Sequence, residues 1–319
     1  MRNLKRALSL ALAAIMLIGM MVVSACAVSY NDLTDKDQIV NKDAVSMLVS
    51  LGIIEGKPDG SYAPTENVDR AQMAKMLSVI MNKGVDNSAL YQSVNSGLTD
   101  ITSNWAKGHI NYCYTTGIIA GRGNGKFDPA ATVTGNEAAK MLLVAAGYDA
   151  QLEGLTGADW AIKTASLAST LGIFDDLTAP TGDPLTRDNA ALLIYNALDI
   201  EMIQKYENGY AIAFGDHRTL LSTKYGVYKV EGVVTGNEWA QLEDTDSEDA
   251  LAAGKTKMDH VKVYKSTTSN TVVGEYETEK NPVIFNVSTP VDMLGQTVTM
   301  YVRKTTVLAN SEVLGVYVN

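Results

Sequence analysis

The chain of 319 residues has few of the residue types that build metal centres and disulfide frameworks. Its two cysteines and three histidines exclude a multi-cysteine zinc site and a disulfide-stabilised fold. Basic residues are also in deficit, because 26 Lys and Arg face 36 Asp and Glu, for a formal net charge of −10. A nucleic-acid-binding protein needs a basic surface that neutralises phosphates, so we expect no nucleic-acid partner.

The first 27 residues have the three parts of a secretory signal peptide. A short basic start is followed by an apolar stretch from Ala7 to Val23 and by small residues from Ser24 to Ala27. We predict export and removal of residues 1–27. Two alternatives remain open: Val23–Cys26 resembles a bacterial lipobox, which would place a lipid on Cys26, and the apolar run is long enough for a retained membrane anchor.

A 13-residue pattern that begins with Gly-Ile and ends with Pro occurs three times. Its copies are Gly52–Pro64, Gly117–Pro129 and Gly172–Pro184. A tryptophan precedes the second and third copies by 12 residues, at Trp105 and Trp160. Internal repeats of this length indicate one supersecondary unit used several times.

Each copy predicts a helix, a loop and a second helix. Apolar residues at helical spacing end at the first glycine of the pattern, which is a typical C-terminal position for glycine. After the proline, a capping box marks the second helix three times, at Asp69–Gln72, Thr134–Glu137 and Thr186–Asn189. The third box is weaker, because Asn is shorter than Glu or Gln. Cys113 falls on a predicted helix, where we expect a buried small hydrophobe.

The segment from Thr99 to Leu143 resembles an S-layer homology module. Asp69–Gln72 and Thr186–Asn189 resemble the Thr-Arg-Ala-Glu signature of that family. The resemblance implies a pseudo-threefold helical bundle that holds surface proteins on the wall of Gram-positive-type bacteria. It also implies non-covalent binding of secondary cell-wall polymer, often pyruvylated, or of peptidoglycan. The modules would occupy residues 28–82, 98–150 and 151–200, with a linker at 83–97.

We expect the ligand to lie in grooves between modules, at the starts of the second helices. A helix N-terminus favours anions, an arginine beside it adds hydrogen-bond donors, and a tryptophan offers a flat wall for a sugar. Each residue also has a purely structural interpretation: a helix cap, an anchor in the core, or a solvated or ion-paired arginine. The candidate site residues are Asp69, Arg70, Trp105, Thr134, Trp160, Thr186 and Arg187.

The modules depart from the family pattern in different places. The first has Val40 where the others have tryptophan, and the second has Gly135 where the arginine would stand. The third has Asp175 and Asp176 in place of a glycine-rich stretch and is three residues shorter before its second helix. Only one or two grooves are therefore expected to bind, and the groove of the third loop is the least favoured.

The last third of the chain changes from helical spacing to the alternation of strands. Residues 201–224 are interpreted as a connector, and residues 225–319 as a β-rich domain of five to seven short strands, a small barrel or sandwich. The fold class is thus multi-domain α plus β. Asp244–Asp249 lacks the glycine and the closing glutamate of a calcium loop, and we predict no cofactor, metal site or catalytic group.

These features predict a non-enzymatic, secreted protein of the cell wall or S-layer of a Gram-positive-type bacterium. The helical modules would bind wall polysaccharide, while the β-rich domain would serve display or self-assembly on the cell surface. The alternative is a secreted enzyme or substrate-binding protein whose β-rich domain is active and merely tethered by the modules.

Overall fold

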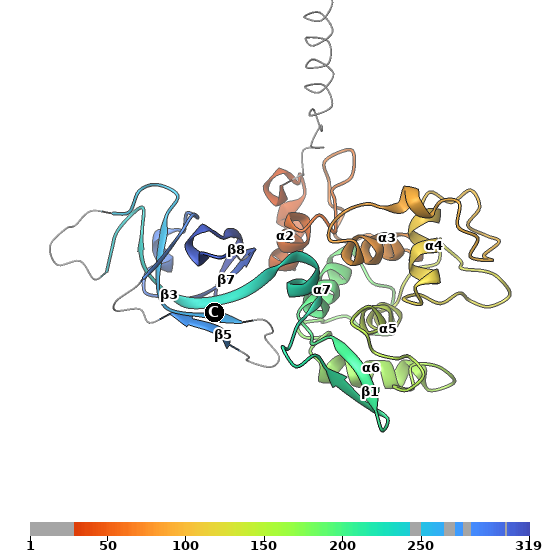
Figure 1. Cartoon of the computed structure of the whole chain (residues 1–319). Helices are drawn as coiled ribbons and strands as arrows, with labels where there is room; N and C mark the ends of the chain where they lie inside the picture. The colour runs from red at the N-terminus through yellow and green to blue at the C-terminus, as the bar shows by residue number, and fades with distance from the viewer. Residues whose placement is uncertain (1–28, 243–249, 265–271, 277–281, 304) are drawn as a thin grey trace, which may run out of the picture.

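A computed structural model of the chain describes residues 29–242, 250–264, 272–276, 282–303 and 305–319 (Figure 1). The predicted signal peptide, including Cys26, and the acidic segment Asp244–Asp249 lie outside the described residues. Among the residues described, no helix combines the length and the apolar character needed to cross a membrane.

Three helix pairs flank the three repeated loops, as the sequence predicts. Short 3₁₀ turns at Tyr30–Asp32, Lys36–Gln38 and Ser88–Tyr91 connect or precede them. The helices are α2 (Lys42–Ser50) and α3 (Arg70–Met81), α4 (Lys107–Thr115) and α5 (Gly135–Ala145), and α6 (Trp160–Thr170) and α7 (Arg187–Leu198).

The capping boxes start the second helix of each pair. Asp69 accepts a hydrogen bond from the backbone N–H of Gln72 at 2.7 Å, and the Gln72 side chain accepts one from the Asp69 N–H at 3.0 Å. Thr134 and Glu137 repeat this reciprocal pair at α5. Thr186 accepts one such bond at 3.2 Å, and no return bond from the side chain three residues later completes the box. The prediction of two full boxes and one weaker box is confirmed.

A ring of three backbone hydrogen bonds joins the segments that precede α3, α5 and α7. The N–H of Val68 donates to the carbonyl of Leu185 at 2.9 Å, Leu185 donates to Val133 at 2.8 Å, and Val133 donates to Val68 at 3.0 Å. All three residues are buried. Each helix pair is therefore bonded to both of the others at one central point.

One hydrophobic core runs through all three helix pairs. Tyr62 and Phe127, the aromatic residues of the first two loops, are 1% and 0% exposed and fill the space between helices. Cys113 is fully buried, which confirms its prediction as a small core residue, and burial raises the pKa of its thiol.

The segment interpreted as a connector has structure of its own. It forms a hairpin of β1 (Ile203–Glu207) and β2 (Tyr210–Ala213), which projects from the helical part, and a π-helical turn at Leu221–Tyr225 (Figure 1). Tyr206 fixes the hairpin, because its hydroxyl accepts from the N–H of Asp149 and donates to Glu153.

The remaining strands form one open antiparallel sheet. The order β5-β4-β3-β7-β8 has β6 paired on β4, and the ends β5 and β8 do not pair with each other. This single sheet corrects the expectation of a barrel or sandwich in the described residues. Its strands are β3 (Val227–Asn237), β4 (Thr256–Tyr264), β5 (Val272–Tyr276), β6 (Val283–Phe285), β7 (Thr297–Arg303) and β8 (Glu312–Val318).

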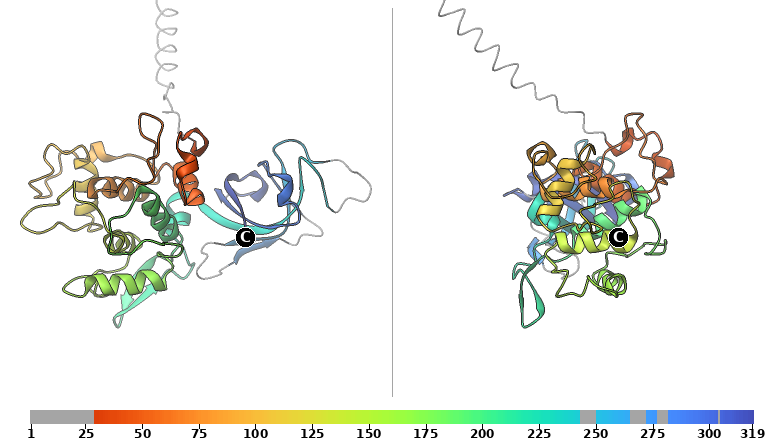
Figure 2. Two further views of the ribbon diagram at one scale, coloured as in Figure 1. Left: turned by 180° about the vertical axis from the view of Figure 1, so that it is seen from behind. Right: turned by 90° about the vertical axis from the view of Figure 1, so that its right-hand side faces the viewer.

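The sheet and the helical part lie side by side and are joined through β3 (Figure 2). Tyrosines form the junction between them. The hydroxyl of Tyr195 on α7 donates to that of Tyr301 on β7 at 3.0 Å, and the ring of Tyr317 on β8 lies 6.1 Å from that of Tyr301. Tyr301 and Val227 belong to the core of the helical part, so the two parts share buried surface.

Candidate ligand-binding grooves

Arg70 fixes the first helix pair to the loop of the second. It begins α3 and is only 3% exposed. Its Nε donates to the carbonyl of Phe127 at 2.9 Å and its Nη2 to that of Ala120 at 2.7 Å, while the guanidinium stacks 4.4 Å from the centre of the Phe127 ring. Burial lowers the pKa of Arg70 to about 10, so the guanidinium keeps its charge at neutral pH.

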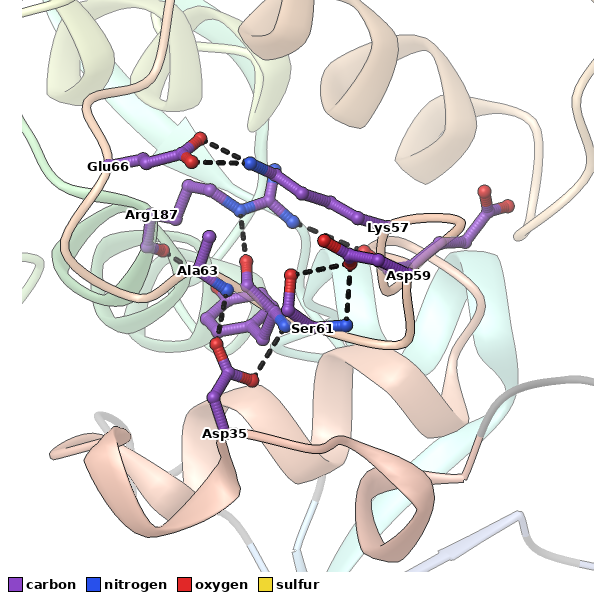
Figure 3. A network of polar contacts seen from close by, with 9 residues as sticks. Asp35, Lys57, Asp59, Ser61, Ala63, Glu66 and Arg187 are labelled. Atoms are coloured by element: carbon purple, nitrogen blue, oxygen red, sulfur yellow. Dashed lines mark hydrogen bonds and ion pairs between the residues drawn. The ribbon is translucent and has the colours of Figure 1, made fainter.

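Arg187 repeats this arrangement between the third pair and the first loop (Figure 3). Its Nε donates to the carbonyl of Tyr62 at 2.7 Å, its Nη2 to that of Glu55 at 3.2 Å, and its guanidinium lies 4.8 Å from the Tyr62 ring. The Tyr62 hydroxyl donates back to the carbonyl of Arg187 at 2.8 Å. Both arginines thus bond to backbone carbonyls of a neighbouring unit, which replaces the interpretation as solvated or ion-paired residues.

At the start of α5 the equivalent position is Gly135, and only backbone groups make the contact with the neighbouring loop. The N–H of Asn136 donates to the carbonyl of Thr181 at 2.8 Å. A Cβ at Gly135 would lie 2.9 Å from that carbonyl oxygen, closer than real Cβ contacts allow. Glycine is therefore required here, and no side chain extends from this position to the third loop.

The first N–H groups of α3 and α7 already have acceptors in the protein. The N–H groups of Arg70 and Ala71 donate to carbonyls of the second loop, at Ala131 and Pro129. Asp69 takes the next N–H by capping. An anion at the start of α3 would therefore compete with neighbouring loops and with the cap for these donors. Thr134 and Thr186 are engaged as caps in the same way.

The first groove, here named the Trp105 groove, is a cavity of about 250 Å³ in which all three helix pairs meet. Lys57 comes from the first loop, Lys75 from α3, Trp105 from the segment before α4, and Arg187 from the start of α7. Trp105 is 58% exposed, so the structural interpretation that we favoured for it, an anchor in the core, is wrong.

A second groove, the Trp160 groove, repeats these positions one unit further along the chain and encloses about 360 Å³. Arg122 replaces Lys57, Lys140 replaces Lys75, and the half-buried Trp160 replaces Trp105, with Arg70 at the base. The ammonium of Lys140 lies 5.4 Å from the centre of the Trp160 ring, an arrangement that holds the indole face beside a cation.

A third cavity, the Val40 groove, lies at the third loop and has the opposite character. Its lining includes Val40, which is 83% exposed, and the carboxylates of Asp176 and Asp188, but no tryptophan, lysine or arginine. Val40, Gly135 and Asp176, the departures from the family pattern in the three modules, therefore all lie at the third loop. Arg187 does not belong here, since it lines the Trp105 groove.

The three grooves differ in their local charge. Each tryptophan groove is lined by three cations and one carboxylate, for a net formal charge of +2, whereas the Val40 groove has two carboxylates and no cation. Two positive sites thus exist on a chain whose net charge is −10. The sequence interpretation missed Lys57, Lys75, Arg122 and Lys140, although aligning the first two copies places a basic residue at both positions.

Helix–loop–helix units with basic, tryptophan-walled grooves between them define a helical repeat protein. The model of the S-layer homology domain matches residues 29–74 and 97–139. The chain is therefore an S-layer homology domain protein, and the third helix pair lies outside the matched segments.

The relatives that the chain matches are mainly named as proteins of the cell surface or cell wall. The chain is 29% identical over 226 residues to the middle cell wall protein of Brevibacillus brevis, covering 68% of this chain and 20% of the relative. It is 31% identical over 214 residues to a cell surface protein of Thermoanaerobacter kivui, covering 66% and 26%. It is also 28% identical over 189 residues to the exoglucanase XynX of Acetivibrio thermocellus, covering 54% and 16%. The chain thus spans about a quarter or less of the length of these relatives.

Proposed function

We propose that this chain is a non-enzymatic cell-surface protein, held non-covalently on the wall of a Gram-positive-type bacterium by anionic wall polysaccharide. The support is the S-layer homology domain and a relative named as a cell wall protein. The observation that carries the ligand class is the pair of positive, tryptophan-walled grooves. Secretion by a cleaved signal peptide, with a lipid on Cys26 as the alternative, is part of the proposal.

The three helix pairs act as three modules of one pseudo-threefold bundle, at residues 28–82, 98–150 and 151–200. The ring of hydrogen bonds among Val68, Val133 and Leu185 supports this, because it treats the third pair as equivalent to the other two. The placement of Arg70 and Arg187 supports it too, since each reaches from one helix start to a neighbouring loop.

Two of the three grooves bind. The apolar face of a sugar ring packs on the indole of Trp105 or Trp160, and a carboxylate or phosphate on that sugar pairs with the lysine and loop cation beside it. A pyruvyl carboxylate on secondary cell-wall polymer has the required charge. The Val40 groove stays empty, because its two carboxylates repel an anionic sugar.

The sheet of β3–β8 serves display or self-assembly outside the wall. A tethered enzyme is the second candidate, favoured by the relative named exoglucanase. Release of reducing sugar from purified walls by the chain lacking residues 1–27 would establish that candidate instead.

Co-sedimentation with purified cell walls tests the proposal. The chain lacking residues 1–27 should pellet with intact walls and remain in the supernatant once secondary polymer has been extracted from them. Binding that survives complete extraction would assign peptidoglycan as the ligand, and absence of binding to either preparation would contradict wall anchoring.

A further inference from the structure

The two tryptophan grooves differ at one position of the repeated loop. The first copy reads Gly-Ile-Ile-Glu-Gly and the second Gly-Ile-Ile-Ala-Gly, so that Glu55 and Ala120 occupy equivalent places. Both residues line their grooves, and both side chains are exposed. Their backbone carbonyls perform the same task, since Arg187 donates to one and Arg70 to the other.

The lysine of the Trp105 groove is already paired. The Nζ of Lys75 lies 3.2 Å from a carboxylate oxygen of Glu55. Asp86 is also close enough to interact with Lys75 electrostatically. An anionic ligand that pairs with Lys75 must therefore displace one carboxylate and approach a second.

The equivalent lysine of the Trp160 groove is available. Ala120 has no carboxylate to offer, and no ion pair of Lys140 occurs within the described part of the chain. Lys140 stands over the Trp160 ring instead. The carboxylate of this groove, Glu137, is bonded to Arg122 and to the N–H of Thr134, so it is occupied elsewhere.

We propose that the residue at positions 55 and 120 sets the relative affinity of the two grooves, so that the Trp160 groove fills before the Trp105 groove. This inference rests on the proposed function, because it assumes that both grooves bind anionic sugar. Breaking an exposed ion pair and adding one nearby repulsion changes affinity about two- to fivefold. Glu55 thus acts as an internal competitor for the ligand's negative charge.

The chain's three tryptophans allow each groove to be followed separately by NMR of 5-fluorotryptophan. Trp105 and Trp160 report on the two grooves, and the exposed Trp239 of the sheet serves as the control. The probe is the methyl glycoside of a 4,6-pyruvylated N-acetylhexosamine, added to the chain lacking residues 1–27. Trp160 should reach half-saturation at a probe concentration about two- to fivefold lower than Trp105, while the signal of Trp239 stays unchanged.

Exchanging the two residues tests the cause. Glu55→Ala should lower the half-saturation concentration of Trp105 toward that of Trp160, and Ala120→Glu should weaken binding at Trp160 alone. The uncharged methyl ester of the probe should show no difference between grooves. Unfolding temperatures equal to that of the parent chain confirm that both variants fold.

The outcomes separate the two proposals. Equal half-saturation in the parent chain, earlier filling at Trp105, or no effect of either exchange would overturn this inference and leave the proposed function standing. If neither groove signal moves with the probe, the proposed ligand class fails, and the inference fails with it.

Discussion

The guanidinium of Arg70 stacks on the ring of Phe127 and donates to the carbonyl of the same residue at 2.9 Å. Arg187 and Tyr62 have the same relationship one unit away, at 2.7 Å. The signature arginines therefore hold the helix pairs together and form the floor of the grooves. Under the proposed function, recognition of the ligand falls to the tryptophans and to cations that the signature does not contain.

Replacing Arg70 with alanine should destabilise the chain. The carbonyl groups of Phe127 and Ala120 would lose their donors inside the protein, and we expect the free energy of unfolding to fall by about 2–4 kcal/mol. Denaturant unfolding followed by circular dichroism measures this. Arg122→Ala is the control, since that side chain is exposed and should cost about 0–1 kcal/mol. An Arg70→Ala protein of unchanged stability would contradict the structural role.

Replacing either groove tryptophan should weaken wall binding with little change in stability. Trp105 is largely exposed, so Trp105→Ala removes a platform for sugar rather than part of the core. We expect affinity for intact walls to fall about three- to tenfold for Trp105→Ala. Trp239→Ala removes an equally exposed tryptophan from the sheet and should bind as the parent chain does. Equal losses of wall affinity in Trp105→Ala and in the control Trp239→Ala would show that binding is not located in the grooves.

A single methyl group at Gly135 should disturb the contact between the second and third helix pairs. Alanine favours helices over glycine by up to about 1 kcal/mol, so an uncrowded site would gain stability. Here the added Cβ would lie 2.9 Å from the Thr181 carbonyl oxygen, and we expect a loss of about 1–3 kcal/mol. Thermal unfolding gives the sign. Gly182→Ala is the matched control, because nothing lies within 4 Å of its Cβ position.

His109 should make stability depend on pH. Its ring is buried against Ser78, with Asp86, Lys75 and Trp105 around it. Burial lowers the pKa of His109, Asp86 opposes this effect, and Lys75 adds to it. The unfolded chain therefore takes up this proton more readily, and stability from this group is lost as pH falls below about 6.5.

His109→Gln isolates that contribution. The stability difference between the parent chain and the variant should shrink as pH is lowered from about 7.5 to 5.5. In the parent alone, the unfolded chain gains a proton on this histidine that the folded chain takes up less readily. Urea unfolding at several pH values measures it. A difference that stays constant or grows toward acid pH would show that His109 is protonated in the folded state.

Local structure was predictable from sequence because it depends on neighbours in the chain. The capping residues Asp69 and Thr134 start helices where the capping-box pattern places them, and Cys113 enters the core as its position on a predicted helix suggests. The hairpin of β1 and β2 was missed, since its polar strands show little of the alternation that marks a half-buried strand.

The composition of the grooves was not predictable from any single module. Each groove takes its loop from one helix pair, its aromatic position from the next and its arginine from the preceding pair. Val40, Gly135 and Asp176 therefore affect one loop although they stand in three different units. The sequence could not show whether Trp105 is buried or exposed for the same reason, because its exposure depends on the tertiary arrangement.

If two grooves bind anionic wall glycan and the third does not, the chain has a fixed stoichiometry of binding. Isothermal titration calorimetry with polymer fragments that carry one anionic sugar measures it. We expect two fragments per chain, one for either Trp105→Ala or Trp160→Ala, and none for the double variant. Three fragments per chain, or two that persist in the double variant, would contradict it.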